Sequence, residues 1–218
     1  MRVAIAGAGA VGRSIALELV DNNHQVMLIE RELSNIDPES VEAAEWVHAD
    51  ACELASLEEA GLETCDVVIA ATGDDKVNLV VSLLAKTEFA VRRVVARVND
   101  PTNEWLFGQN WGVDVAVSTP RLLAALVEEA VAVGDLVRLM TFRQGQANLV
   151  EVTLPEDTPL AGQAVGKLKL PADSALVVVL RGGRVIVPQA DDALEAGDEL
   201  LFVATTAVEE DIRAALGY

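Results

Sequence analysis

The sequence is poor in the side chains that most enzymes and nucleic-acid-binding proteins depend on. Its 218 residues include two histidines and two cysteines, and aromatic residues make up only 4%. Cys52 and Cys65 do not have the spacing of a metal site, so no metal centre is expected, and both thiols are interpreted as ordinary small side chains in a reducing cytoplasm. With so few aromatic residues, the chain also lacks the stacking platforms that bind single-stranded nucleic acid.

Basic residues and long apolar runs are scarce as well. Lys and Arg total 16 against 35 Asp and Glu, which gives a formal net charge of -19. So acidic a protein repels nucleic acid and anionic membrane surfaces, although a helix start can still bind an anion locally. No apolar run reaches the ~20 residues that a membrane span needs, and the first residues resemble a strand rather than a signal peptide. We expect a cytoplasmic protein that does not bind nucleic acid.

What the sequence does contain is a glycine-rich turn between a strand and a helix. The apolar run Arg2–Ala6 suits a buried strand, and a helix is expected over Gly12–Val20. The glycines between them have the spacing G-x-G-x-x-G, in which the first allows a sharp turn, the second lets a pyrophosphate approach the backbone, and the third lets the helix pack closely. The predicted phosphate-binding loop comprises Gly7, Ala8, Gly9, Ala10, Val11 and Gly12.

Glu30 completes the dinucleotide-binding pattern. It follows a second apolar run, Gln25–Ile29, and comes about 18 positions after Gly12. In dinucleotide-binding folds, an acid that hydrogen-bonds a ribose is expected ~20 residues after the glycine loop. The alternative is a solvated strand end with no ligand. Arg31, the next residue, is open to two interpretations: it pairs with Glu30, or it favours a phosphate on the ribose.

Strand-like and helix-like segments alternate through the first part of the chain. Further strands are expected at Trp46–Ala49, Asp66–Ala70, Arg93–Val98 and Gly112–Val117, and further helices at Glu53–Ala60, Asp75–Lys86, Pro101–Leu106 and Pro120–Val133. Either Asp74 or Asp75 is expected to cap the helix that follows them. This alternation predicts a doubly wound parallel sheet with right-handed crossovers.

The pattern changes at Gly134, beyond which β-structure dominates. Strands are expected at Leu136–Phe142, Asn148–Leu154, Ala175–Leu180, Val185–Val187 and Glu199–Ala204, before a final helix at Ala207–Leu216. The pair Gly182-Gly183 is a strong hairpin signal. The predicted fold class is therefore α/β: a Rossmann-like doubly wound parallel sheet over residues 1–134, followed by a small α+β module over residues 135–218.

The sequence offers a nucleotide site without an evident reaction. His24 lies before the second strand and His48 in the third, neither at a position expected to face the crevice where a cofactor would react. No nucleophile elbow, zinc-protease motif or Walker lysine is present. We therefore expect a protein that is not an enzyme, with an NAD-dependent oxidoreductase as the alternative.

Several longer phrases point to a family. They are AIAGAGAVG, HADACELASLEEAG, DVVIAATGDDKVNLVVSLLAK, ARVNDPTN and ALEAGDELLFVA. Together they resemble the regulator-of-K+-conductance (RCK) proteins of the bacterial Trk and Ktr potassium-uptake systems, over essentially the whole chain. The resemblance implies an N-terminal RCK domain of Rossmann type and a C-terminal RCK module.

The resemblance also implies a function and partners. It implies a peripheral subunit, held at the inner face of the cell membrane by its partner, that binds NAD(H) or else ATP or ADP. Such a subunit gates a separate membrane potassium-translocating protein and assembles into homodimers or larger rings. A nucleotide-sensing regulator of another cation transporter is the alternative. The helix Pro120–Val133 is apolar on more than one face, so we expect it to pack against a second subunit as well as against its own sheet.

Finally, the resemblance implies roles for individual residues. The glycine loop would hold the phosphates and Glu30 the adenosine ribose. The other residues implied in the site are Asp50 and Ala51 along the adenine, Thr72, Gly73 and Asp74 beside the pyrophosphate and distal ribose, and Arg97 near a phosphate. Asn99 departs from the residue often found nearby and is left out of the prediction.

Overall fold

The computed structural model describes residues 1–131, 134–142 and 147–217. Contacts divide the chain into two compact units, Met1–Pro120 and Arg121–Tyr218. The sequence analysis placed the domain boundary after Gly134. It therefore assigned the helix after Pro120 to the first domain, whereas the contacts assign most of that helix to the second unit. Residues 132–133, the end of that predicted helix, lie outside the described residues.

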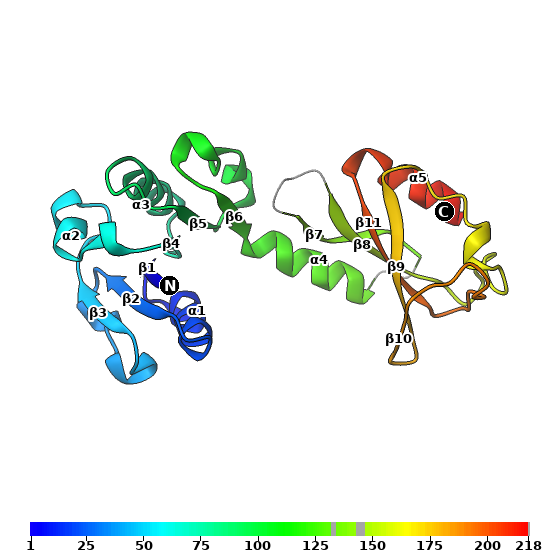
Figure 1. Ribbon diagram of the computed structural model, residues 1–218, viewed down its shortest axis with the longest axis horizontal. Helices are drawn as coiled ribbons and strands as arrows, with labels where there is room; N and C mark the ends of the chain where they lie inside the picture. Colours follow the sequence, from blue (N-terminus) through cyan, green and yellow to red (C-terminus); the bar gives the residue numbers. More distant parts are fainter. Residues whose placement is uncertain (132–133, 143–146, 218) are drawn as a thin grey trace. The chain divides into compact units, whose positions relative to one another are not determined.

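The first unit is built on a six-stranded parallel sheet in the order β3-β2-β1-β4-β5-β6 (Figure 1). The chain winds outward in one direction from β1 and in the other from β4, which confirms the predicted doubly wound sheet. The strands are β1 (Arg2–Ala6), β2 (Gln25–Glu30), β3 (Glu45–His48), β4 (Val67–Ala70), β5 (Arg93–Val98) and β6 (Val115–Ser118).

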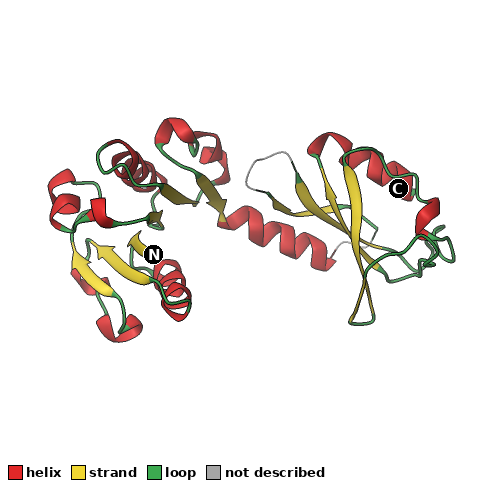
Figure 2. Ribbon diagram, viewed as in Figure 1, coloured by secondary structure: helices red, strands yellow, loops and turns green. Residues whose placement is uncertain are grey.

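Helices cover both faces of this sheet, as the colouring of Figure 2 makes visible. They are α1 (Ala10–Asp21), α2 (Leu54–Glu59) and α3 (Asp75–Thr87). Successive strand side chains point to opposite faces, so Ile5 packs in a core cluster with Ala16 of α1. Its neighbour Ala6 packs in a second cluster with Leu57 of α2 and Leu79 of α3. Burial on both faces explains why these strands read as continuous apolar runs.

The helix predicted over Pro101–Leu106 is present with 3₁₀ geometry. The structure has a 3₁₀-helix, η4 (Pro101–Leu106), and then a second short one, η5 (Gln109–Trp111). Asp100 caps η4 by accepting a hydrogen bond from the backbone N–H of Thr102. Phe107 then leaves the helical conformation and is buried in the core.

The second unit contains a five-stranded antiparallel sheet in the order β10-β9-β11-β8-β7. Its elements are α4 (Thr119–Val131), β7 (Val137–Thr141), β8 (Asn148–Thr153), β9 (Ser174–Arg181), β10 (Arg184–Ile186), β11 (Glu199–Ala204) and α5 (Glu209–Leu216). Ile212 and Leu216 of α5 pack with Phe202 in its buried core. The predicted hairpin is present, because Gly182 and Gly183 join β9 to β10 with positive φ angles.

Helix α4 exposes much of its apolar surface. Its large exposed apolar side chains are Leu122, Leu123, Leu126, Val127 and Val131. Their exposed fractions run from 43% to 75%, far more than a core-facing helix shows. Among the described residues, no helix is both long enough and apolar enough to span a bilayer.

Candidate nucleotide-binding site

The candidate site lies at the carboxyl ends of β1 and β4, the point at which the strand order reverses. Open parallel sheets bind ligands in the crevice outside such a switch point. Ala6 and Ala70 end the two strands in register. The loops that follow are held close, because the Gly7 N–H donates to the Ile29 carbonyl and the Ala71 N–H donates to the Ala6 carbonyl, each over 2.8 Å.

The three glycines of the loop are there for different physical reasons. Gly7 has a φ of +98°, and a Cβ on it would lie 3.0 Å from the backbone of Thr72. A Cβ on Gly12 would lie 1.9 Å from the carbonyl oxygen of Gly7, so both glycines are required by the fold. At Gly9 a Cβ would meet nothing within 4 Å, and its φ of -66° suits any residue. The fold does not need a glycine at this position, and the space above it fits a ligand that approaches the backbone.

The start of α1 has the chemistry of an anion site. The helix begins at Ala10, two residues before the predicted start, and no side chain caps it. Helix geometry leaves the backbone N–H groups of Ala10, Val11 and Gly12 without a helical partner. The first turn carries no acidic side chain that would compete with a phosphate for the positive end of the helix dipole. A pyrophosphate therefore fits this helix start.

Glu30 connects the end of β2 to the glycine loop. The residue is 8% exposed, and its carboxylate accepts hydrogen bonds from the backbone N–H of Ala8 at 2.9 Å and of Glu32 at 2.8 Å. A carboxylate has about four acceptor positions, so ribose hydroxyls can still be accepted. Arg31 forms its ion pair with Glu32, at 3.1 Å, and reaches Asp50 at 3.8 Å. The hydrogen bond to Glu32, helped by both carboxylate charges, raises the pKa of Arg31.

The predicted adenine-side residues lie in the loop after β3. Asp50 accepts a hydrogen bond from the backbone N–H of Cys52 at 2.8 Å, and Ala51 is buried. Burial first, and then the charge of Asp50, raises the pKa of the Cys52 thiol. The thiol therefore stays protonated at neutral pH, and it is not a reactive nucleophile.

The loop after β4 is held by the side chain of Asn78 on α3. The hydroxyl of Thr72 donates to the Asn78 Oδ1 at 2.7 Å, and the Thr72 N–H donates to the same oxygen at 2.9 Å. Asp74 caps α3 by accepting from the Lys76 N–H at 2.8 Å. Gly73 is open, since a Cβ on it would meet nothing within 4 Å. Thr72 and Asp74 are thus held in place by hydrogen bonds with α3.

Asp75 is a residue whose importance the sequence did not reveal. Its buried carboxylate accepts hydrogen bonds from the Asn99 N–H at 2.7 Å, the Asp100 N–H at 3.0 Å and the Asn103 Nδ2 at 2.8 Å. Burial alone would raise the pKa of Asp75, but these hydrogen bonds outweigh it, and the pKa lies below its ordinary value. The Asn99 Nδ2 also donates to the Thr72 carbonyl at 3.1 Å. Asp75 and Asn99 therefore join the loop after β4 to the loop after β5.

Two arginines are candidates for contact with a phosphate. The Arg97 Nε, at the end of β5, is buried and has no hydrogen-bond partner among the described residues. A buried, unpaired guanidinium donor is costly, and a phosphate oxygen would satisfy it. Arg13, which the sequence analysis missed, donates from its Nη1 to the Ala8 carbonyl at 2.8 Å. Its position directly after the third glycine was the available signal.

Comparisons with known proteins agree with this architecture. The TrkA-N domain model matches residues 3–119, and the TrkA-C domain model matches residues 149–217. The chain is 66% identical over 216 residues to the Trk system potassium uptake protein TrkA of Mycobacterium tuberculosis, covering 99% of this chain and 98% of that protein. The chain belongs to the TrkA family. A TrkA homolog of Methanothermobacter thermautotrophicus is 31% identical over 220 residues, with both chains covered to 100%.

Solved structures show the same fold. The GsuK channel bound to NAD superposes on the whole chain with a TM-score of 0.73 at 18% identity, and 39% of that channel chain is covered. The crystal structure of the GsuK RCK domain has a TM-score of 0.69 at 18% identity, with 48% of its chain covered. At this identity the likeness establishes the fold alone, which is that of an RCK protein. This TrkA-family chain thus has the predicted Rossmann-like sheet and C-terminal RCK module.

Proposed function

We propose that this TrkA-family chain is a regulatory subunit that binds an adenine nucleotide and gates potassium uptake through a separate membrane subunit. NAD(H) is the first candidate nucleotide, and ATP or ADP is the second. The observation that carries the proposal is the open space above Gly9 beside the uncapped start of α1. A fold that needed only a tight turn would have no reason to keep a glycine there.

The other residues of the site support a nucleotide with a diphosphate. Glu30 would accept the hydroxyls of an unphosphorylated ribose, while a 2′-phosphate would meet its negative charge. The Arg97 Nε, which has no hydrogen-bond partner in the described part of the chain, would donate to a phosphate oxygen. The similarly folded GsuK channel was solved with NAD bound, which favours NAD(H) among the candidates. Asp50, Ala51, Thr72, Gly73 and Asp74 would line the remainder of the nucleotide, as the family resemblance implies.

We further propose that the chain works as a homo-oligomer and that α4 forms part of the contact between copies. The five large apolar side chains on α4 are exposed in the single chain. An apolar stripe of this kind on a water-facing helix is a frequent sign of a protein interface. If the nucleotide binds one arrangement of the oligomer more tightly than another, it increases the population of the arrangement that it prefers. A membrane partner bound to the oligomer would respond to that change.

Nucleotide binding is tested by thermal-shift titration of the purified chain with NAD+, NADH, NADP+, ATP and ADP. A ligand that binds only the folded state raises the melting temperature. We expect a rise with NAD(H) or with ATP or ADP, and a smaller one with NADP+. If none of the five nucleotides changes the melting temperature, the nucleotide-binding part of the proposal is wrong.

Gating is tested separately. The chain and the potassium-translocating subunit from the same organism are reconstituted in liposomes, and uptake of rubidium-86 is measured with and without the nucleotide that binds. We expect the nucleotide to change the uptake rate only when the regulatory chain is present. If the purified chain instead changes the absorbance of NAD+ or NADH when common substrates are added, hydride transfer is taking place, and the oxidoreductase alternative is supported.

A further inference from the structure

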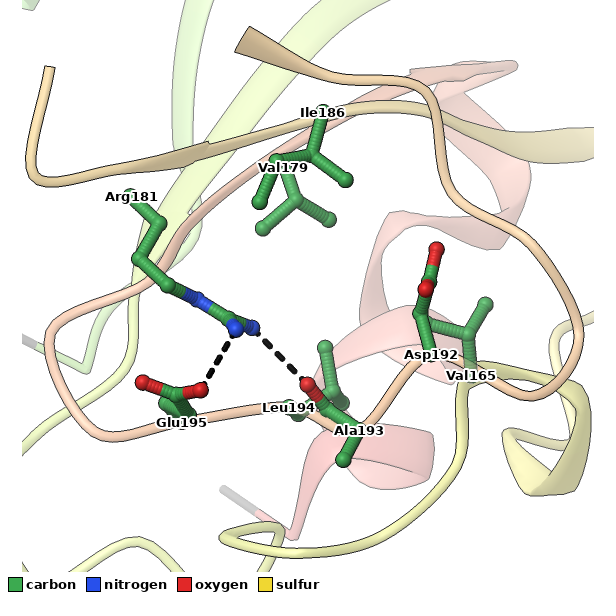
Figure 3. Close-up of a pocket in the computed structure, with 8 residues that line it drawn as sticks. All are labelled: Val165, Val179, Arg181, Ile186, Asp192, Ala193, Leu194 and Glu195. Carbon is green, nitrogen blue, oxygen red and sulfur yellow. Dashed lines mark hydrogen bonds and ion pairs between the residues drawn. The ribbon is translucent and has the colours of Figure 1, made fainter. Parts of the chain in front are cut away.

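The second unit contains a small cavity between β9, β10 and the loop before β11. It has a volume of about 130 Å³, similar to a protein cavity that holds one benzene molecule. Its lining residues are Val165, Val179, Arg181, Ile186, Asp192, Ala193, Leu194 and Glu195 (Figure 3). Two of its walls are joined by backbone hydrogen bonds, because the Val165 N–H donates to the Asp192 carbonyl at 2.8 Å and the Leu194 N–H donates to the Gln163 carbonyl at 2.9 Å. The cavity is therefore preformed.

The one cation of the cavity is already neutralised by the protein. Arg181 donates from Nε and Nη2 to the two carboxylate oxygens of Asp198, at 2.6 and 2.8 Å, and Asp198 is fully buried. A further bond runs from Arg181 Nη1 to Glu195 at 2.6 Å, and Figure 3 shows the guanidinium turned toward Glu195 and Ala193. Arg181 is thus a structural anchor for the loop and not a free anion-binding group.

The cavity keeps an excess of negative charge. Asp192 and Glu195 are the two carboxylates that line the cavity, and the buried Asp198 behind them already balances the charge of Arg181. Glu195 is largely exposed, and one oxygen of Asp192 accepts from the Gln189 N–H at 2.7 Å, which leaves its other oxygen available. A cation is therefore favoured at this rim.

Opposite the acidic rim, the walls are apolar. Val179 is buried in the core, and Ile186 lies beside it across the β9–β10 pair, as Figure 3 also shows. A ligand that suits both surfaces has an aliphatic stem and a terminal cation, which describes a lysine side chain.

The surroundings of the cavity favour a macromolecule over a free ammonium compound. Strand β10 is the edge of its sheet, and Val185 and Val187, on either side of Ile186, are 72% and 68% exposed. Exposed apolar side chains on an edge strand are a surface on which an extended peptide can add. A small amine would leave these valines in water.

We propose that β10 and the adjoining cavity are a docking site for an extended basic segment of a partner protein, with one lysine side chain of that segment inserted into the cavity. The chain's net charge of -19 attracts such a segment from a distance. The cavity then selects it, because the stem contacts Val179 and Ile186 while the ammonium group meets Asp192 and Glu195. This surface lies in the second unit, and the proposal does not rest on the nucleotide site.

The test uses two labelled peptides and the full chain. The first is acetyl-Val-Thr-Lys-Val-Thr-amide, and the second replaces Lys with norleucine, which keeps the stem and removes the charge. Fluorescence anisotropy measures their affinities for the native chain and three variants. Ile186→Trp fills the cavity without changing the charge, Asp192→Asn removes the acid at the rim, and Asp191→Asn is the matched control, an exposed neighbour outside the lining.

We expect the lysine peptide to bind the native chain and Asp191→Asn equally. Binding should weaken about tenfold or more in Ile186→Trp and in Asp192→Asn, and also when norleucine replaces lysine. The norleucine comparison needs no variant, so it decides even if Ile186→Trp fails to fold. Absence of lysine-peptide binding overturns the proposal, as does equal binding of the two peptides. If folded Ile186→Trp binds the lysine peptide as tightly as the native chain does, the peptide is only attracted to an acidic protein, and the proposal is wrong. If that variant loses self-association, a second copy of the chain occupies the surface, which also overturns the proposal.

Discussion

The carboxylate of Glu30 accepts a hydrogen bond from the backbone N–H of Ala8 over 2.9 Å. This bond links the end of β2 to the glycine loop, so the residue proposed to hold the ribose also holds the loop proposed to bind the phosphates. Any change at Glu30 therefore affects stability and ligand binding together, and its effects must be separated by a control.

Replacement of Glu30 by alanine should destabilise the chain and remove the nucleotide response. The Ala8 and Glu32 N–H groups lose their acceptor, at a cost of about 1–3 kcal/mol in the free energy of unfolding. The rise in melting temperature with nucleotide should disappear. Glu32→Ala is the matched control, because its side chain is 59% exposed, and it should keep both properties. A full nucleotide response in Glu30→Ala would contradict the ribose role.

Alanine at the second glycine should lower nucleotide affinity, whereas alanine at the third should lower the stability of the fold. In Gly9→Ala the new methyl group meets no protein atom within 4 Å, so stability should hardly change while nucleotide affinity falls about tenfold or more. In Gly12→Ala the methyl group would lie 1.9 Å from the Gly7 carbonyl, and unfolding free energy should fall by about 1–3 kcal/mol or more. Chemical denaturation and calorimetric titration measure the two quantities. Unchanged affinity in Gly9→Ala would mean that the open space does not hold the nucleotide.

The adjacent residues Asp74 and Asp75 should differ in their importance for stability. Asp75→Asn puts an amide group against donors that now meet a buried carboxylate, so we expect a loss of about 3 kcal/mol. Asp74→Asn should be nearly neutral, because asparagine caps a helix as well as aspartate does. Urea denaturation of both variants beside the native chain measures this difference, and equal losses would contradict it.

The same carboxylate predicts a pH dependence. Because the pKa of Asp75 in the folded chain is lowered from its ordinary value of 3.8, its ionised form stabilises the folded state above that pH. This contribution is lost as the pH falls below 3.8 and through the lower pKa of the folded state. The stability difference between the native chain and Asp75→Asn should therefore be largest near neutral pH and shrink in acid. A difference that does not change with pH would contradict the ionised role.

Removal of the Arg97 guanidinium should weaken phosphate binding without unfolding the chain. Arg97→Met keeps much of the stem and eliminates a buried donor that has no partner among the described residues, so stability should stay the same or rise slightly. Affinity for ADP should fall about tenfold or more, while affinity for adenosine should be unaffected. Equal losses for ADP and adenosine would show that Arg97 does not act on the phosphates.

Charge on the exposed face of α4 should separate the subunits. Leu123→Glu places a carboxylate among exposed apolar side chains, which would be desolvated in the proposed contact between copies. Sedimentation equilibrium should show a shift toward monomer, with little change in the melting of the monomer itself. Glu128→Gln, also exposed, is the control on the same helix. A native chain that is already monomeric at micromolar concentration would argue against this interface.

Local patterns in the sequence were sufficient for much of the fold. The parallel sheet was predicted from the run Arg2–Ala6, the glycine turn and the alternation of apolar segments. Such a prediction is possible because strand burial and helix periodicity depend on near neighbours in the chain. Gly182-Gly183 fixed the β9–β10 hairpin for the same reason, and Asp74 was one of two expected caps. The Pro101 segment was predicted as a helix without a type, and only the structure shows its 3₁₀ geometry.

Only the tertiary structure decided which polar groups meet. Asp75 bonds to Asn99 and Asn103, which are far away in the sequence, because β4 and β5 become neighbours in the sheet. Likewise, the lack of a partner for the Arg97 Nε among the residues that the structure describes, and the distinct surroundings of Gly9 and Gly12, exist only once the chain is packed. A sequence determines local propensity and burial period by itself, whereas hydrogen bonds between distant segments depend on strand order and register, which are set by packing of the whole chain.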